Sequence, residues 1–192
     1  MYALVESGNI TKIFHNPKGF KLGDNQYSAD VFTKWSNSER EAIGIYAVTI
    51  DNTNKKNEKW YTNTNQTFTY DASAKTVTAT YGTATAKAHA DVTTDGVVTP
   101  GLKTELIRDL KKDVSRILSE TDWYITRNSE KSTAIPSNIT THRDAVRTKQ
   151  AEMETAITNA ADTAALETLY TYTDQEDGTA TRPLGELPEL ES

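Results

Sequence analysis

The sequence contains no cysteine among its 192 residues, and it has no long apolar run. The lack of cysteine excludes thiol catalysis, a disulfide framework and zinc sites built on cysteine. No uninterrupted apolar segment approaches the roughly 20 residues that a membrane-spanning helix needs. The opening MYALVESGNI also lacks the basic start and apolar core of a signal peptide. We therefore expect neither a membrane span nor a signal peptide.

An excess of basic charge is also missing. The formal net charge is -6 and the pI is about 5.1, which argues against a protein that coats nucleic acid. A mean hydropathy of -0.64 describes a polar chain. The length is nevertheless sufficient for one or two domains that bury a core without covalent staples.

Recognisable catalytic and ligand-binding motifs are lacking as well. The three histidines, His15, His89 and His142, are far apart in the sequence and do not form a metal-binding motif. The sequence has no Gly-x-Ser-x-Gly elbow, no phosphate-binding glycine loop and no dinucleotide-binding fingerprint. The acidic DQEDG segment lacks the ligand spacing of a calcium loop. We therefore expect no catalytic residue, no metal and no cofactor.

What is present first is a series of β-strand patterns, which predicts a β-rich domain over residues 1–98. The Gly8-Asn9 pair predicts a tight turn between two opening strands. Ser36 and Glu39 have the spacing of a capping box, which predicts one short helix. Further strands are expected from the runs IYAVTID, EKWYTN, QTFTYD and KTVTATYGT. The segment 83–101 is interpreted as a connector.

The second domain, 99–171, is predicted to be an antiparallel helical hairpin followed by a short third helix. Apolar residues recur at helical spacing in two segments on either side of Pro136, and Asp162 can cap the third helix. The expected core positions are Leu102, Leu106, Leu110, Val114 and Ile117 or Leu118 on the first helix and Ile139, His142 or Arg143, Val146, Met153 and Ile157 on the second. Ser137 or Thr140 is the expected cap of the second helix.

Residues 172–192 are predicted to form an extended acidic tail, because two prolines and several acids interrupt any regular element. Within it, Arg182, Leu184 and Leu187 are candidate partner-binding residues that can lie in a groove of a neighbouring subunit. Removal of the residues after Thr179 is expected to weaken assembly without changing the stability of the monomer. The predicted fold class as a whole is α+β.

Aromatic and basic residues are concentrated between residues 121 and 149. Trp123, Tyr124 and Arg127 can form a stacking platform that holds an anion or a base. They can equally cover the link between the two helices, and this packing interpretation is preferred because the segment carries the proline and caps of an interhelical corner. Burial of Trp123 would then make it a packed cap on the hairpin.

Arg143 and Arg147 are four residues apart and therefore share one face of the second helix. Each can pair with a carboxylate, from the same chain or from a partner. We include both among the partner-binding candidates, together with Trp123, Tyr124 and Arg127.

Two segments resemble small tail-associated proteins of tailed bacteriophages, including phages of marine bacteria. The first is YALVESGNITKIF with the pattern of Trp35, Glu39, Arg40, Gly44 and Ile45 that follows it. The second is a helix ending in Asp122-Trp123, then Pro136, then a helix containing Arg143 and Arg147. The resemblance covers about half the chain and implies no catalytic residue.

The resemblance implies a non-enzymatic structural or adaptor protein of the phage particle, in the fibre, baseplate or collar of the tail. Its partners would be other phage structural proteins, in a homo-oligomer or a symmetric assembly, and its location would be the virion. The alternative is a tail-fibre assembly chaperone that is absent from the mature particle. An enzyme, such as a small hydrolase, is the third class considered.

Overall fold

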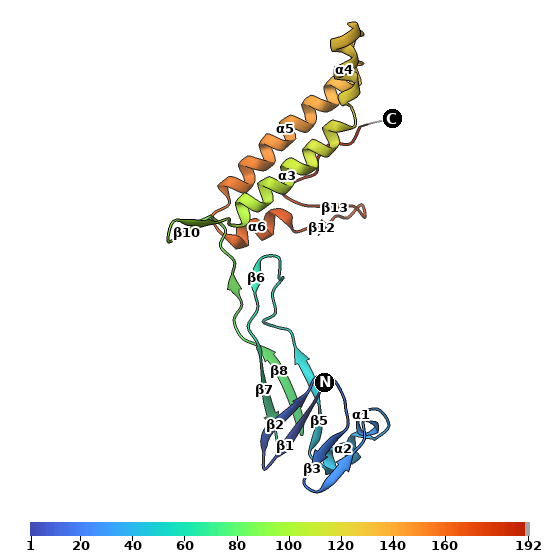
Figure 1. The fold of residues 1–192 in the computed structure, drawn as a ribbon, viewed down its shortest axis with the longest axis vertical. Helices are drawn as coiled ribbons and strands as arrows, with labels where there is room; N and C mark the ends of the chain where they lie inside the picture. Colours follow the sequence, from blue (N-terminus) through green and yellow to red (C-terminus); the bar gives the residue numbers. More distant parts are fainter. Residues whose placement is uncertain (191–192) are drawn as a thin grey trace. The chain divides into compact units, whose positions relative to one another are not determined.

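The computed structural model describes residues 1–190, and the final two residues of the predicted tail lie outside this part. The described chain is a mixed α/β protein with a β-rich N-terminal half and six helices (Figure 1). It divides into two compact units, residues 1–85 and the residues from Ala86 onward. The segment 86–98, which the sequence placed with the β-rich domain, belongs to the second unit. Each unit is described by itself below.

The first unit is built on a five-stranded sheet with the order β2-β1-β5-β8-β7. Neighbouring strands are antiparallel except β5 and β8, which are parallel. The strands are β1 (Tyr2–Glu6), β2 (Asn9–Phe14), β5 (Ile45–Asp51), β7 (Gln66–Asp71) and β8 (Thr76–Tyr81). The shorter strands of this part are β3 (Phe20–Leu22), β4 (Asn25–Tyr27) and β6 (Tyr61–Thr62).

The turn between β1 and β2 lies one residue earlier than the sequence predicted. Its two central residues are Ser7 and Gly8, with φ of 50° and 80°, and Asn9 is already the first residue of β2. A two-residue hairpin turn of this type needs positive φ at both central positions. Ser7 therefore occupies the left-handed conformation that we expected for Asn9.

Two short helices, not one, follow in the first unit: α1 (Asp30–Thr33) and α2 (Asn37–Ala42). The capping box of α2 is confirmed, because the Glu39 amide donates to Ser36 Oγ at 3.3 Å and the Ser36 amide donates to Glu39 Oε2 at 2.8 Å. The hydrogen bonds also lower the pKa of the Glu39 carboxyl below its usual value.

The core of the first unit lies between the opening strands and the short helices. It is rich in aromatic rings, and the centroids of neighbouring rings lie 5.0 to 5.6 Å apart. The buried residues of this cluster are Leu4, Phe14, Phe20, Val31, Phe32 and Ile45. Trp35 and Tyr27 pack against its edge.

The second unit begins with material that the sequence left as a connector. Strand β9 (Thr85–Ala86) lies at the boundary, and β10 (Val92–Thr94) pairs with β11 (Val97–Thr99) in an antiparallel hairpin. Asp95 and Gly96 form its turn, with φ of 51° and 78°. These are the angles that Asp-Gly favours in a two-residue hairpin.

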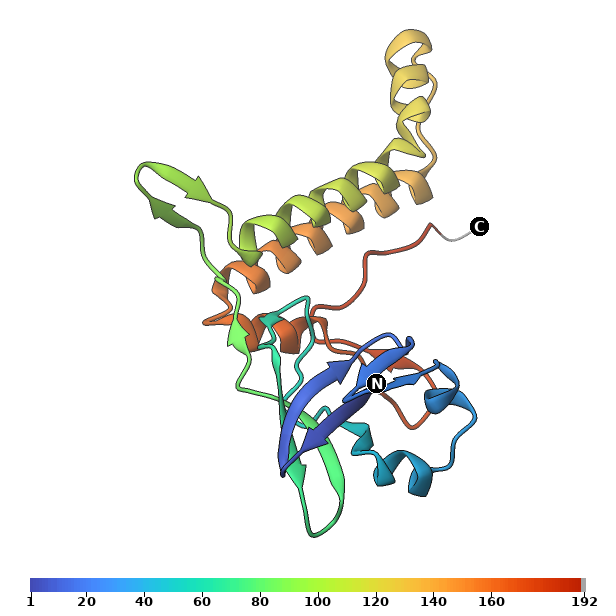
Figure 2. The same cartoon turned by 60° about the horizontal axis from the view of Figure 1, so that its bottom comes forward.

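The main body of the second unit consists of α3 (Leu102–Ser119) and α5 (Ser137–Asn159), which lie side by side and run in opposite directions (Figures 1 and 2). The helical spacing identified the buried faces, although Ile117 and Leu118 at the end of α3 are only partly buried. The buried residues are Leu102, Leu106, Leu110 and Val114 on α3 and Ile139, His142, Arg143, Val146, Met153 and Ile157 on α5. Helix α6 (Thr163–Tyr170) is capped as predicted, since the Ala165 amide donates to Asp162 Oδ1 at 2.8 Å.

The segment between α3 and α5 differs from the predicted corner. It contains a further helix, α4 (Asp122–Lys131), so Asp122 and Trp123 begin a helix where the resemblance had them ending one. The N-terminal cap of α5 also differs: Pro136 occupies this position, and neither Ser137 nor Thr140 provides a side-chain cap.

The C-terminal segment packs on its own chain, contrary to the expectation of a free tail. It forms a small hairpin from β12 (Thr173–Asp174) and β13 (Ala180–Thr181). The Leu184 amide then donates to the Leu169 carbonyl at 3.1 Å, and the Leu184 side chain is only 3% exposed. Truncation after Thr179 would remove this buried side chain, so we now expect the truncated monomer to lose stability.

Candidate interaction surface on helix α4

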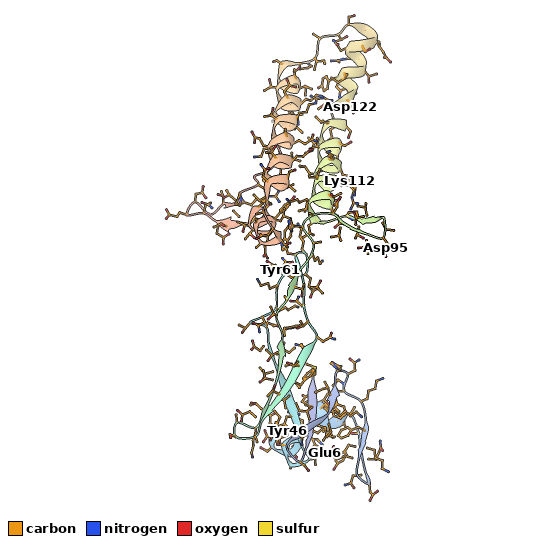
Figure 3. The ribbon with its side chains drawn as sticks, turned by 90° about the vertical axis from the view of Figure 1, so that its left-hand side faces the viewer. Glu6, Tyr46, Tyr61, Asp95, Lys112 and Asp122 are labelled. Atoms are coloured by element: carbon orange, nitrogen blue, oxygen red, sulfur yellow. The ribbon has the colours of Figure 1, made fainter. Side chains whose placement is uncertain are left out.

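A buried arginine fixes the start of α4. The guanidinium of Arg143 on α5 donates to the Leu118 carbonyl at 2.7 Å and to Thr121 Oγ1 at 2.6 Å. Its other terminal nitrogen donates to Asp122 Oδ1 at 2.9 Å. Leu118 is in the last turn of α3 and Asp122 is the first residue of α4, so one side chain joins three helices. Figure 3 labels Asp122 at this junction.

The junction explains why α4 begins where it does. Thr121 is buried and has a non-helical backbone, with φ of -115° and ψ of 6°. Its hydroxyl makes a hydrogen bond with the Leu118 carbonyl at 3.1 Å, while Arg143 satisfies the same carbonyl from the side. A helix end with these partners leaves fewer backbone groups without hydrogen bonds. Asp122 also places a negative charge at the positive end of the α4 dipole.

Beyond the junction, α4 carries an aromatic and cationic surface that we call the α4 platform: Trp123, Tyr124 and Arg127. Cζ of Arg127 lies 4.6 Å from the centroid of the Trp123 ring and 5.4 Å from that of Tyr124. The two ring centroids are 3.8 Å apart. Arg127 therefore lies over both rings, which is the arrangement of a cation–π contact.

The α4 platform is open to solvent. Trp123 is 51% exposed and its neighbour Ile125 is 42% exposed. None of the ten α4 residues, all of which the structure describes, is buried. The prediction that Trp123 is a packed cap on the hairpin is therefore wrong.

The cation of the platform has no acidic partner within the described part of the chain. Arg127 is half-buried, and its Nε has no hydrogen-bond partner among the described residues. The exposed ring provides apolar contact area and the guanidinium provides donors in a fixed fork. This combination suits a carboxylate carried on an apolar segment, such as an acidic stretch of a partner protein.

The second predicted arginine, Arg147, has a different environment. It lies one turn beyond Arg143 on α5, is exposed, and is 3.5 Å from Asp144 of the same helix. Such an exposed pair contributes little to stability. The equivalence that the sequence suggested between the two arginines is therefore absent: Arg143 is buried at a junction and Arg147 is solvated.

The remaining candidates, Arg182, Leu184 and Leu187, lie in the C-terminal segment and not on α4. Nε of Arg182 lies 2.7 Å from the Glu186 carboxylate, and its guanidinium lies over the Tyr170 and Tyr172 rings at 5.3 and 5.2 Å. Leu187 is partly buried. The structure thus brings together Trp123, Tyr124 and Arg127 on α4, whose first residue Asp122 pairs with Arg143, and leaves the C-terminal candidates elsewhere.

Sequence reasoning did not select Thr121 or Ile125, and it named Asp122 only as the end of a helix in the resemblance. The Thr-Asp pair immediately before aromatic residues is a usable helix-start signal, because Asp in the first turn is favoured. Ile125 shows no periodic pattern with apolar neighbours and could not have been selected.

In the described part of the chain, no three histidine or acidic side chains converge to hold a metal ion. The helices that the structure describes are each too short or too polar to span a bilayer. No family model, curated protein or solved structure matches this chain.

Proposed function

We propose that this chain is a non-enzymatic adaptor of a bacteriophage tail that acts through contacts with other subunits, and that the α4 platform is one of its binding surfaces. The observation that carries the proposal is the exposure of Trp123 beside Arg127, a cation that has no acidic partner among residues 1–190, on a helix that Arg143 holds through Asp122. The phage context rests on the resemblance of the opening segment and of the Trp123 to Arg147 region.

Three features support an adaptor more than an enzyme. The α4 platform is a projecting surface, whereas active sites are usually concave. Aromatic residues and arginine are the residue types that concentrate binding energy at protein interfaces. Two compact units in one chain also allow two different neighbours to be linked.

The composition of purified particles tests this proposal. Particles from a phage that carries the gene are separated on a density gradient and quantified by mass spectrometry against a known tail subunit. We expect a fixed stoichiometric ratio of this chain to that subunit. Absence of the chain from particles, with abundance in the lysate, would favour the assembly chaperone and contradict the adaptor.

A matched pair of variants tests the surface. Trp123→Ala and Arg127→Ala are expected to reduce incorporation, whereas Arg147→Ala changes an exposed arginine of the neighbouring helix and is expected to leave incorporation unchanged. Equal incorporation of all three variants would show that the α4 platform is not a binding surface. It would not contradict the proposal that the chain is a component of the particle.

A further inference from the structure

The hairpin β10–β11 presents apolar side chains on both of its faces. Val97 is 67% exposed and Val98 is 57% exposed, and neighbouring residues of a strand point to opposite faces. The register pairs Val92 with Thr99 and Thr94 with Val97, so Val92 and Val97 lie on one face and Val98 on the other. All six strand residues are exposed. A two-stranded hairpin of this kind is marginally stable in water unless something covers it.

The base of the hairpin is held firmly against the start of α3. The Asp91 carboxylate accepts hydrogen bonds from the Gly101 amide at 2.8 Å and from the Thr104 hydroxyl at 2.6 Å. The Leu102 amide donates to the Ala88 carbonyl at 2.9 Å, and the Lys103 amide donates to the His89 carbonyl at 3.0 Å. These four hydrogen bonds hold the base of the hairpin and fix the direction in which it leaves α3.

Gly101 tightens this base further. A Cβ at this position would collide with the backbone of Ala90, so only glycine allows the two segments to approach so closely. Figure 2 shows the hairpin projecting away from the N-terminal end of α3. The hairpin therefore does not cover the outer face of its own α3.

That outer face of α3 forms a shallow groove with apolar character. Ile107 contributes an apolar side chain to its lining, and the aliphatic stems of lysine and arginine add further apolar surface. The lining residues are Thr104, Ile107, Arg108, Lys111, Lys112 and Ser115, all on α3. Figure 3 labels Lys112 on this helix and Asp95 at the turn of the hairpin.

The hairpin and the groove have complementary charge. The segment 90–99 carries two acids, Asp91 and Asp95, and no basic residue. The groove carries three basic residues, and each lies near a carboxylate of its own chain. Lys112 is 3.2 Å from Asp109, Lys111 is 3.8 Å from Glu154 and Arg108 is 3.8 Å from Glu105. Exposed pairs of this kind contribute little and are easily exchanged for a partner's carboxylate.

We propose that the β10–β11 hairpin of one copy of this chain docks on the α3 groove of a second copy. The face of the hairpin that carries Val98 then covers Ile107 and the lysine stems, and Asp95 approaches Lys111 and Lys112. A hairpin that is fixed at its base and projects from the unit can reach a neighbour but not its own groove. This inference concerns self-association and does not depend on the α4 platform or on the phage context.

Cross-linking tests the contact directly, because the wild-type chain has no cysteine that could react. The variants Val98→Cys and Ile107→Cys are purified separately, mixed, oxidised and separated on a non-reducing gel. We expect the mixture to give a cross-linked dimer at a yield at least tenfold above that of either variant alone. Cross-linking of Val98→Cys alone at the same yield would indicate hairpin-to-hairpin contact and overturn the proposal.

Sedimentation equilibrium of the full chain is a second test, because it measures self-association. We expect a dimer or larger species that dissociates on dilution, and at least tenfold weaker association for the double variant Val97→Thr/Val98→Thr, which keeps the size and β propensity of valine. Ile50→Thr is the control, since Ile50 is an exposed strand residue of the first unit. A wild-type chain that is monomeric up to about 0.5 mM would contradict the proposal.

Discussion

The Arg143 guanidinium on α5 lies 2.9 Å from the Asp122 carboxylate at the start of α4. The two partners differ in environment, because the Arg143 side chain is 9% exposed whereas that of Asp122 is 59% exposed. The Arg143 side of the ion pair is therefore held within the protein, whereas the Asp122 side is open to water. It fixes the direction of α4 without burying any α4 residue.

Replacement of Arg143 is expected to destabilise the second unit. Arg143→Met keeps much of the length and packing but removes the hydrogen bonds to Leu118 and Thr121. We expect a loss of about 2 to 3 kcal/mol in the free energy of unfolding, because the buried Thr121 hydroxyl and the partly buried Leu118 carbonyl lose a charged donor. Urea denaturation followed by far-ultraviolet circular dichroism measures this change. Arg147→Met is the control and should change the free energy of unfolding by less than about 0.5 kcal/mol. Equal effects of the two substitutions would show that the junction around Arg143 does not stabilise the unit.

Replacement of Trp123 is expected to leave stability nearly unchanged. The side chain is half exposed, so Trp123→Ala should cost less than about 1 kcal/mol, compared with about 3 to 5 kcal/mol for a buried tryptophan. Thermal melting of the variant and of Val146→Ala, a fully buried position on α5, gives the comparison. A loss for Trp123→Ala as large as that for Val146→Ala would show that the platform is part of the core.

The C-terminal segment is expected to stabilise its own unit. Leu184→Ala should cost about 2 to 4 kcal/mol because a nearly fully buried leucine leaves a cavity. Leu187→Ala is the matched control, since Leu187 is only partly buried and should cost less. Denaturant unfolding of both variants measures the difference. A chain truncated after Thr179 that unfolds like the wild type would show that the segment does not contribute.

The pH dependence of the first unit is expected to reflect a pair of tyrosines. The hydroxyls of Tyr46 and Tyr70 are 3.2 Å apart, and this hydrogen bond, with burial, raises the pKa of Tyr46 to about 12. Because the folded value exceeds the ordinary value of 10.0, the contribution to stability is present below pH 10 and is lost as pH rises toward 12.

Titration of the tyrosine ring signals by NMR measures this pKa. Tyr70→Phe removes the hydrogen bond, so the pKa of Tyr46 should move back toward 10.0. Tyr81→Phe removes a hydroxyl elsewhere in the same sheet and is the control. If Tyr70→Phe left the Tyr46 titration unchanged, as the control should, the hydrogen bond would not be the cause of the raised pKa.

The buried faces of α3 and α5 could be predicted because the apolar residues of each helix repeat at three and four residues. The capping box of α2 and the Asp162 cap of α6 were equally readable, since a cap needs only local side-chain and backbone groups. Periodicity is a consequence of burial on one face. It therefore identifies a helix only where that helix packs.

Helix α4 escaped prediction for this reason. Its sequence DWYITRNSEK has no apolar stripe, because none of its residues is buried in the described structure. Its position depends on Arg143, which is 21 residues away from Asp122 in the sequence. Such a long-range hydrogen bond leaves no local pattern. The same limit applies to Leu184 and Leu187, which look alike in sequence although only the first is fully buried.

Incorporation of variants into particles tests the central claim most directly. Phage particles are assembled in cells that supply either the wild-type chain, Trp123→Ala or Arg147→Ala, and the chain is quantified in purified particles. The account predicts full incorporation of the wild type and of Arg147→Ala, and at least tenfold less of a folded Trp123→Ala chain, which corresponds to ~1.4 kcal/mol of lost binding energy. Wild-type particles that contain none of this chain would contradict the account.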